Sequence, residues 1–259
     1  MAIILDEYEW VENCIREKQL GSKPLEALAR VARYYYENKF TKKEIRKRLD
    51  TFLIQCDPNA SLIRWSDTLD KIARNVGKYK LIKLDGIDVF QSEIDTINAL
   101  QGMQLKRFAF TLLCTSKYWD AVTGTNSHWV NTKDNEIMEM ANIDTSIKRQ
   151  CKMFSDLRDL GLIRFSKKVD NLNVQVLFSV DSGEQALRVQ DFRNLGYQYM
   201  RLCGGKFFEC SECGIVLKEK DDRRGPKQKY CASCAAKIRI EQSINSINRR
   251  RYANQRKNV

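Results

Sequence analysis

The sequence predicts a mainly α-helical fold with small β hairpins, and three observations support this class. Apolar residues recur at steps of three and four in several segments between residues 25 and 160, the period of a helix buried along one face. The 259 residues include only 12 Gly and 3 Pro, too few for a sandwich of many short strands. Two Cys-x-x-Cys pairs indicate a small metal-binding module. We therefore divide the chain into a helical N-terminal region (1–100), a second domain (101–200) and a C-terminal module (201–259).

Helix signals dominate the N-terminal region. Pro24 suits the first turn of a helix, where its missing N–H costs nothing. Thr41 and Glu44 have the spacing of a capping box at the start of a second helix. A third helix is predicted over residues 61–76. The run Tyr34-Tyr35-Tyr36 is either a stacking platform for bases or part of a bundle core, and the helical spacing favours the core for two of the three.

The segment 105–180 has the order buried helix, very short strand, helix, tight turn, longer helix and hairpin. The paired helices are predicted over residues 134–141 and from residue 145 to about 160, where Gly161 suits the helix end. The hairpin is predicted to turn at Asp170-Asn171. Helix, turn, helix and hairpin is the order of a winged helix-turn-helix, in which the second helix enters the major groove and the hairpin contacts phosphates.

Candidate nucleic-acid contacts lie on the longer helix and on the hairpin. The inward face of that helix is predicted to consist of Ile147, Cys151, Phe154, Leu157 and Leu160. Its exposed face then carries Thr145, Ser146, Lys148, Arg149 and Lys152, and the hairpin adds Lys167 and Lys168. Hydroxyl groups and cations of this kind bind base edges and phosphate oxygens. The alternative is a winged helix used for protein contact, with its lysines only solvated.

The metal-binding signal is the pair of motifs Cys210-Ser-Glu-Cys213 and Cys231-Ala-Ser-Cys234, separated by 17 residues. Two residues between thiols let one turn place both sulfurs on one ion, and two such turns complete a tetrahedron. Four thiolates leave no position open for water, so we predict one structural Zn²⁺. A hairpin between the pairs and a helix from Ala235 to about Gln255 would resemble a treble clef or zinc ribbon.

The C-terminal module also carries most of the net charge. The chain has 45 Lys and Arg against 33 Asp and Glu, for +12, and a pI near 9.3. Residues 201–259 hold 15 basic and 6 acidic residues, for +9. A localised positive surface attracts a polyanion. The candidate phosphate contacts on the last helix are Lys237, Arg239, Arg249, Arg250 and Arg251. The alternative is a basic tail without a specific role.

The five remaining cysteines are scattered singly. An odd total of nine cysteines without a secretory signal indicates a reducing compartment, so we predict free thiols in a cytoplasmic protein. The first residues resemble neither a signal peptide nor an anchor. No apolar run approaches the ~18 residues of a membrane span, so a membrane is not an expected partner.

Residues 105–240 resemble a family of uncharacterised proteins from phages and prophages of Gram-positive bacteria. The resembling stretches are LKRFAFTLLCTSKYW, HWVNTKDNEIMEMANI, SDLRDLGLIRFSKKV, FRNLGYQYM, FECSECGIVLK and QKYCASCAAKIR. They cover about half of the chain. The resemblance implies no reaction, and it suggests a role in phage replication or transcription in the host cytoplasm.

These patterns favour a non-enzymatic protein that binds DNA, with RNA as the other candidate nucleic acid. The alternative is a phage-encoded inhibitor or adaptor that acts on a host nucleic-acid machine through a protein contact. An enzyme is the weakest reading, because the sequence has no phosphate loop, no His-Glu-x-x-His and no partner for its single histidine, His128. Asp85, Asp88 and Glu93 are spaced like a surface loop rather than a metal-binding cluster.

Overall fold

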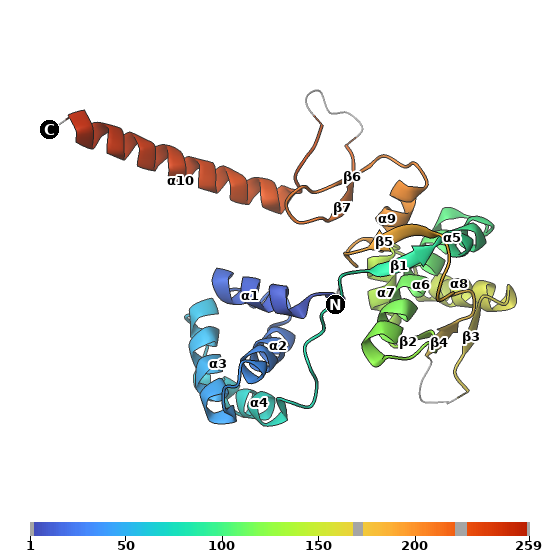
Figure 1. The fold of residues 1–259 in the computed structure, drawn as a ribbon, viewed down its shortest axis with the longest axis horizontal. Helices are drawn as coiled ribbons and strands as arrows, with labels where there is room; N and C mark the ends of the chain where they lie inside the picture. Colours follow the sequence, from blue (N-terminus) through green and yellow to red (C-terminus); the bar gives the residue numbers. More distant parts are fainter. Residues whose placement is uncertain (1–2, 168–172, 221–226, 258–259) are drawn as a thin grey trace. The chain divides into compact units, whose positions relative to one another are not determined.

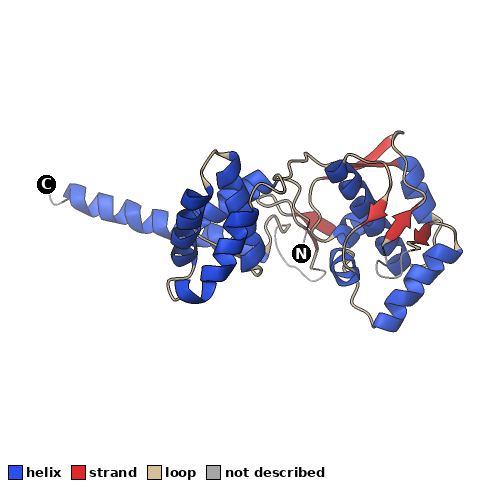
Figure 2. Cartoon of the chain, turned by 90° about the horizontal axis from the view of Figure 1, so that it is seen from below, coloured by secondary structure: helices blue, strands red, loops and turns tan. Residues whose placement is uncertain are grey.

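The structure, a computed structural model, describes residues 3–167, 173–220 and 227–257, the last eight of these by their backbone alone. Helices account for most of the described residues, and the strands are short (Figure 2). The chain divides into two compact units: residues 4–86 form one, and residues 1–3 together with 87–259 form the other. Each unit has its own architecture.

The first unit is a bundle of four helices (Figure 1). They are α1 (Glu7–Glu17), α2 (Pro24–Glu37), α3 (Lys42–Cys56) and α4 (Leu62–Asn75). The core is formed by residues that include Val11, Leu28, Val31, Ile45, Leu49, Phe52, Leu53 and Leu69. The predicted capping box is confirmed, because the Thr41 side chain accepts from the Glu44 amide and the Glu44 carboxylate accepts from the Thr41 amide. Tyr34 and Tyr35 pack against the core, whereas Tyr36 is exposed.

A buried carboxylate links the first helix of this bundle to α2 and to the segment that follows α4. Glu7 is almost fully buried, and its carboxylate oxygens accept from Arg30 Nε at 2.5 Å and from the Ile82 amide at 3.0 Å. The segment after α4 is thereby tied to the start of α1. A buried carboxylate needs such partners, because an unpaired charge in a low-dielectric interior is strongly unfavourable.

The second unit is built around α6 (Met103–Thr123), whose middle is buried on nearly all sides. Its other helices are α5 (Gln91–Asn98), α7 (Asp134–Met140), α8 (Ile147–Asp159), α9 (Leu195–Leu202) and α10 (Ala232–Lys257). Its strands are β1 (Ile87–Phe90), β2 (Trp129–Val130), β3 (Ile163–Phe165), β4 (Val174–Val176), β5 (Gln185–Val189), β6 (Phe207–Glu209) and β7 (Val216–Lys218). They form three antiparallel sheets: β1 with β5, β2–β4–β3, and β6 with β7.

The weak alternation in residues 81–90 predicts a short hairpin or an extended connector, whereas the structure has a strand there that pairs with a distant segment. The second half of residues 81–90 is strand β1, in which Ile87 lies opposite Val189 of β5 (Figure 1). This pairing draws residues 87–100 into the second unit, so the boundary falls at residues 86 and 87 rather than near 100. The alternation of two buried and two half-buried residues fits a strand covered on one face.

Glu93, predicted to lie in a surface loop, is instead fully buried. Its carboxylate pairs with Lys117 Nζ of α6 at 2.8 Å and also accepts from the amides of Phe90 and Val180, both at 2.8 Å. Lys117 Nζ donates in addition to the carbonyls of Asp88 and Val180. Burial is tolerable because every charged atom of the pair has partners. The pair joins α5, α6 and the segment that leads to β5.

The helix pair α7 and α8 appears as predicted, but three residues of the second predicted helix do not lie on its inward face. Ile147 is 76% exposed, Leu160 is 58% exposed and Cys151 is exposed, although all three were assigned to the inward face. The buried stripe of α8 consists of Met153, Phe154 and Leu157. Phe154 determines which face of α8 is buried. Its ring centroid lies 4.8 Å from that of Phe108 in α6 and 6.3 Å from that of Phe165 in β3.

Candidate metal centre and the basic helices

Four cysteine side chains meet in the second unit. The sulfurs of Cys210, Cys213, Cys231 and Cys234 all lie within 4.8 Å of one another. The Sγ atoms of Cys213 and Cys231 are 3.8 Å apart. Cys210, Cys231 and Cys234 are buried, with Ile215 and Leu217 packed against them. The cluster is compatible with a four-thiolate metal site, as the spacing of the two motifs predicted.

Two elements bring these cysteines together. The first pair lies in the connection between β6 and β7, where Gly214 has a φ of +72° that favours glycine and donates to the Cys210 carbonyl. The second pair lies at the start of α10: Cys231 precedes the helix and Cys234 is in its first turn. The predicted hairpin is therefore displaced, because it encloses the first pair instead of following it. The predicted hairpin between the two cysteine pairs includes residues 221–226, which lie outside the described residues.

Neighbouring hydrogen-bond donors and burial shift the pKa values of the four thiols in different directions. A hydrogen bond from the Ser233 hydroxyl lowers the pKa of Cys231 to about 6. Burial raises the pKa of Cys210, but backbone amides, first that of Cys231, outweigh it and lower the pKa overall. Burial raises the pKa of Cys213, and it raises that of Cys234 to about 12. A metal ion would supply the positive charge that keeps all four deprotonated, since thiolates are the ligands.

Two side chains from the loop before α9 hold the first pair in place. Arg193 donates to the Cys213 carbonyl at 2.5 Å, and Asn194 Nδ2 donates to the Val216 carbonyl at 3.0 Å. Asn194 also accepts from Asn142, in the turn between α7 and α8. Neither arginine nor asparagine carries a local sequence signal for such a role, so sequence reasoning missed all three residues. Hydrogen bonds through Asn194 thus connect the turn of the helix pair to β7, the strand that follows the first cysteine pair.

The candidate contacts on α8 lie at its surface. Ser146, Lys148, Arg149 and Lys152 are exposed and Thr145 is half-buried. None of the three cations forms an ion pair with a carboxylate in the part of the chain that the structure describes. Lys167, at the end of the strand pair, is exposed as well, whereas Lys168 and the predicted turn at residues 170–171 lie outside the described residues.

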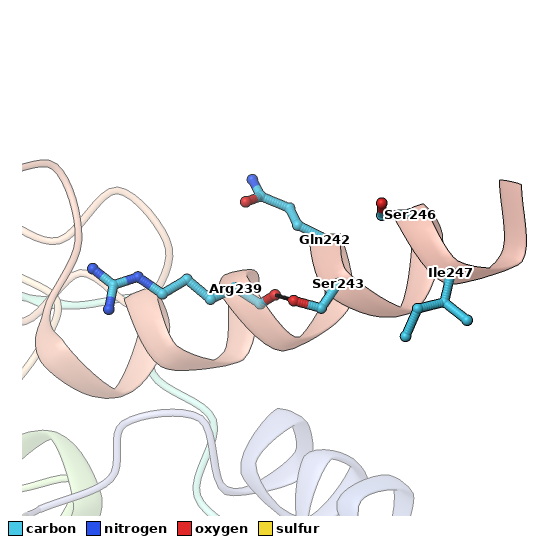
Figure 3. Close-up of a pocket in the computed structure, with 5 residues that line it drawn as sticks. All are labelled: Arg239, Gln242, Ser243, Ser246 and Ile247. Atoms are coloured by element: carbon cyan, nitrogen blue, oxygen red, sulfur yellow. Dashed lines mark hydrogen bonds between the residues drawn. The ribbon is translucent and has the colours of Figure 1, made fainter. Parts of the chain in front are cut away.

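The last helix, α10, has two different faces. Arg239, Gln242, Ser246 and Arg249 follow one another at steps of three and four, and the sticks in Figure 3 put Gln242 and Ser246 on one side of the helix and Ile247 on the other. Ile247 continues an exposed stripe with Ile240 and Ile244. Lys237 is also exposed. The helix includes Arg250 and Arg251, of which only the backbone is described.

His128 has an acidic partner that sequence reasoning missed. Its Nδ1 lies 2.6 Å from Asp120 Oδ2, at the end of α6. Asp120 also accepts from the amides of Ser127 and His128. The carboxylate therefore holds the connection between α6 and β2, in which His128 has a φ of +55°. His128 lies only eight residues after Asp120, so the pair fixes the local loop and does not join distant elements.

Comparison with protein-family models, curated proteins and solved structures gave no match, so function is inferred from this chain's own residues. Among the described helices, none has the length and apolar character needed to cross a membrane.

Proposed function

We propose that the chain is a non-enzymatic DNA-binding protein, in which a winged helix contacts DNA and a structural zinc module holds a basic helix. The observation that carries this proposal is the set of Lys148, Arg149 and Lys152, three exposed cations without carboxylate partners among the described residues, on the second helix of the α7–α8 pair. The resemblance to phage and prophage proteins suggests replication or transcription as its setting.

Zinc suits the cysteine cluster for geometric and chemical reasons. A Zn–S bond of about 2.3 Å in a tetrahedron puts neighbouring sulfurs about 3.8 Å apart. Cys213 and Cys231 already have that separation, and the other sulfurs lie no more than 4.8 Å from one another. A β6–β7 hairpin with one pair at its turn, followed by a helix that supplies the second pair, is the order of a treble clef. Zinc bound by four thiolates stabilises the fold and leaves no place for a reacting water.

The helix pair and the three-stranded sheet supply the winged-helix interpretation. β3 follows α8 directly and pairs with β4, which also pairs with β2. In a winged helix the second helix of the pair lies in the major groove and the hairpin reaches the backbone. Arg149 and Lys152 would then read base edges, and Lys167 would contact phosphate.

The basic face of α10 suits backbone contacts. Arg239 and Arg249 follow the helical spacing of Gln242 and Ser246, whose hydrogen-bonding side chains point away from Ile247 (Figure 3). Contacts of this type neutralise phosphates with little regard to sequence. α8 would therefore provide specificity and α10 would provide affinity.

Fluorescence anisotropy with duplex DNA across a salt series tests this division. Arg149→Ala should lower affinity by about 1–3 kcal/mol on a selected preferred site only. Arg239→Gln combined with Arg249→Gln should weaken binding to every duplex and flatten the salt slope by about 2 units, at about 0.9 per contact. Arg188→Gln is the matched control, since Arg188 is ion-paired with Asp88 on the β1–β5 sheet. If the wild-type chain binds no duplex at low salt, the proposal is wrong.

One observation favours a second candidate, an interaction protein that acts on a host nucleic-acid machine. Ile240, Ile244 and Ile247 form an exposed stripe at steps of four and three on α10. A helix in water does not gain from such a stripe, and partners often cover one. Ile244→Gln would leave DNA binding unchanged under the first proposal. The second candidate is favoured if the wild-type chain binds no DNA and if the Ile244 variant loses a host protein that co-purifies with the wild type.

A further inference from the structure

The net charge of the four-helix unit is concentrated at one end. Residues 4–86 carry 17 basic and 13 acidic residues, a net charge of +4. Two short segments, 36–44 and 74–80, hold six basic and two acidic residues, which is also +4. The rest of the unit is therefore neutral overall. We call these two segments the basic end; its cations are Lys39, Lys42, Lys43, Arg74, Lys78 and Lys80.

Several contacts bring the two segments side by side. Lys42 Nζ, in the first turn of α3, donates to the Arg74 carbonyl at 2.9 Å, in the last turn of α4. Gly77 lies so near the Tyr36 ring that a Cβ at that position would be 2.8 Å from it. The Leu81 amide donates to Glu37 at 2.9 Å. The end of α2, the start of α3 and the end of α4 thus form one surface.

The cations of the basic end face solvent, whereas its carboxylates are occupied. All six cations are exposed, and none forms an ion pair with a carboxylate among the described residues. Glu37 accepts from the Tyr8 hydroxyl and the Leu81 amide, and Glu44 accepts from the Thr41 amide and hydroxyl. The two carboxylates bind uncharged donors, so none of the six cations is neutralised in an ion pair, and the basic end keeps its net charge of +4.

Two aromatic rings lie within this positive surface. Tyr79 is 71% exposed, and the Arg33 guanidinium lies over its ring at 5.8 Å. Tyr36 is 42% exposed and is backed by Gly77. Large exposed rings among cations are the features by which proteins bind unpaired strands: the cations track the backbone and the bases stack on the rings. A duplex keeps its bases stacked on one another and would leave the tyrosines unused.

We infer that the basic end of the four-helix unit binds a single-stranded nucleic acid, with phosphates on the six cations and a base stacked on Tyr79. This inference rests on the proposed nucleic-acid function and adds a second site with a different substrate, an unpaired strand. Together the two sites fit a protein that acts where a duplex opens into single strands.

The test measures binding of the full chain to a labelled oligothymidine and to a duplex by anisotropy across a salt series. Tyr79→Ala should weaken oligothymidine binding by roughly 5- to 150-fold and leave duplex binding unchanged. Tyr79→Phe keeps the ring and should restore binding. Changing Lys43, Lys78 and Lys80 together to Gln should lower the single-strand salt slope by about 2 units, at about 0.7 per contact. The matched control changes Lys18, Lys47 and Arg64, exposed on the same unit, to Gln.

Each outcome decides between the two proposals. If single-strand affinity depends only on Arg239 and Arg249, the basic end has no such role while the proposed function stands. Equal loss from the triple variant and its control, or equal loss from Tyr79→Ala and Tyr79→Phe, overturns the inference. The same holds if Tyr79→Ala changes nothing. A wild-type chain that binds neither ligand overturns both proposals. Circular dichroism of each variant confirms that the helices are intact.

Discussion

Asn142 Nδ2 lies 2.8 Å from Asn194 Oδ1, so a side-chain hydrogen bond spans 52 residues of sequence. Both residues have a φ of +55°, a conformation that asparagine tolerates better than most residues. Asn142 also accepts from the Tyr197 amide at 3.2 Å, and Asn194 donates to the Val216 carbonyl. The turn of the helix pair is thereby joined to the strand that follows the first cysteine pair.

Asn142→Gly should destabilise the second unit by about 1–3 kcal/mol, because it removes the amide and leaves its partners unpaired. Asn142→Ala should cost roughly 1–2 kcal/mol more, since alanine is strained at positive φ. Urea unfolding of both variants measures the two effects separately. Equal stability of the glycine variant and the wild type would contradict a structural role for the hydrogen bonds.

Gly196→Ala should be one of the most destabilising small substitutions in the chain. A Cβ on Gly196 would lie 1.9 Å from the Ala141 carbonyl oxygen, so α9 would have to move away from the end of α7. We expect a loss above about 3 kcal/mol, at the upper end for overpacking. Gly204→Ala is the matched control, because nothing lies within 4 Å of that site and only its φ of +84° is unfavourable. Comparable melting temperatures for the two variants would argue against the close approach.

Signals confined to a few neighbouring residues were read correctly from the sequence. The capping box at Thr41 and Glu44, the two-residue spacing of the cysteines and the glycine at position 161 depend on backbone geometry within one turn. The helix order from α6 to α8 was also predicted, because α6 is a long apolar segment and the two helices after it are separated by a tight turn. The cluster of four cysteines could be located from the spacing of its two motifs.

Features that depend on distant partners could not be read in this way. β1 pairs with β5 across about 100 residues of sequence. No local sequence pattern indicates which segment a four-residue strand will pair with. Glu93 resembled a surface residue in the sequence because its partner, Lys117, lies in a different helix, α6. Cys151 and Ile147 fitted the helical period, but the period does not tell how much of a helix the neighbouring elements cover. These positions were decided by tertiary packing.

The proposed zinc site predicts a selective loss of structure. Cys234→Ser, or chelation under mild heating, should remove one zinc per chain and unfold β6, β7 and the start of α10. Metal binding in such sites is folding free energy, about 10–16 kcal/mol apparent. Cys151→Ser, at an exposed thiol outside the cluster, should retain full metal content. Elemental analysis and amide hydrogen exchange provide the readouts, and metal retained in the Cys234 variant would oppose the assignment.

The buried pair of Glu93 and Lys117 should respond asymmetrically to substitution. Lys117→Met leaves the Glu93 carboxylate buried without its cation and should cost about 3–5 kcal/mol. Combining Lys117→Met with Glu93→Leu should recover part of this loss, because two apolar side chains carry no desolvation penalty. Denaturant unfolding of the single and double variants measures the coupling. Additive losses would mean that the two charges do not interact.

Alkaline pH should weaken the four-helix unit through Tyr8. The hydrogen bond to the Glu37 carboxylate, followed by burial, raises the pKa of the Tyr8 hydroxyl from 10.0 to about 12. A raised pKa means that the stabilising contribution is complete below pH 10 and is lost as the pH rises through about 12. Tyr8→Phe should therefore be less stable at neutral pH and show a smaller decline between those values. Thermal melts at several pH values compare the two proteins.

Because α10 begins at the cysteine cluster, its length fixes how far from the cluster its arginines lie. Arg249 lies 15 residues after Cys234, or about 22 Å along a helix that rises about 1.5 Å per residue. That span corresponds to between six and seven base steps of B-DNA, at about 3.4 Å each. One inserted residue would turn everything beyond it by about 100° as well as lengthening the reach. The number of residues between the clustered cysteines and the arginines of α10 therefore sets both how far from the cluster the positive charges lie and in which direction they point.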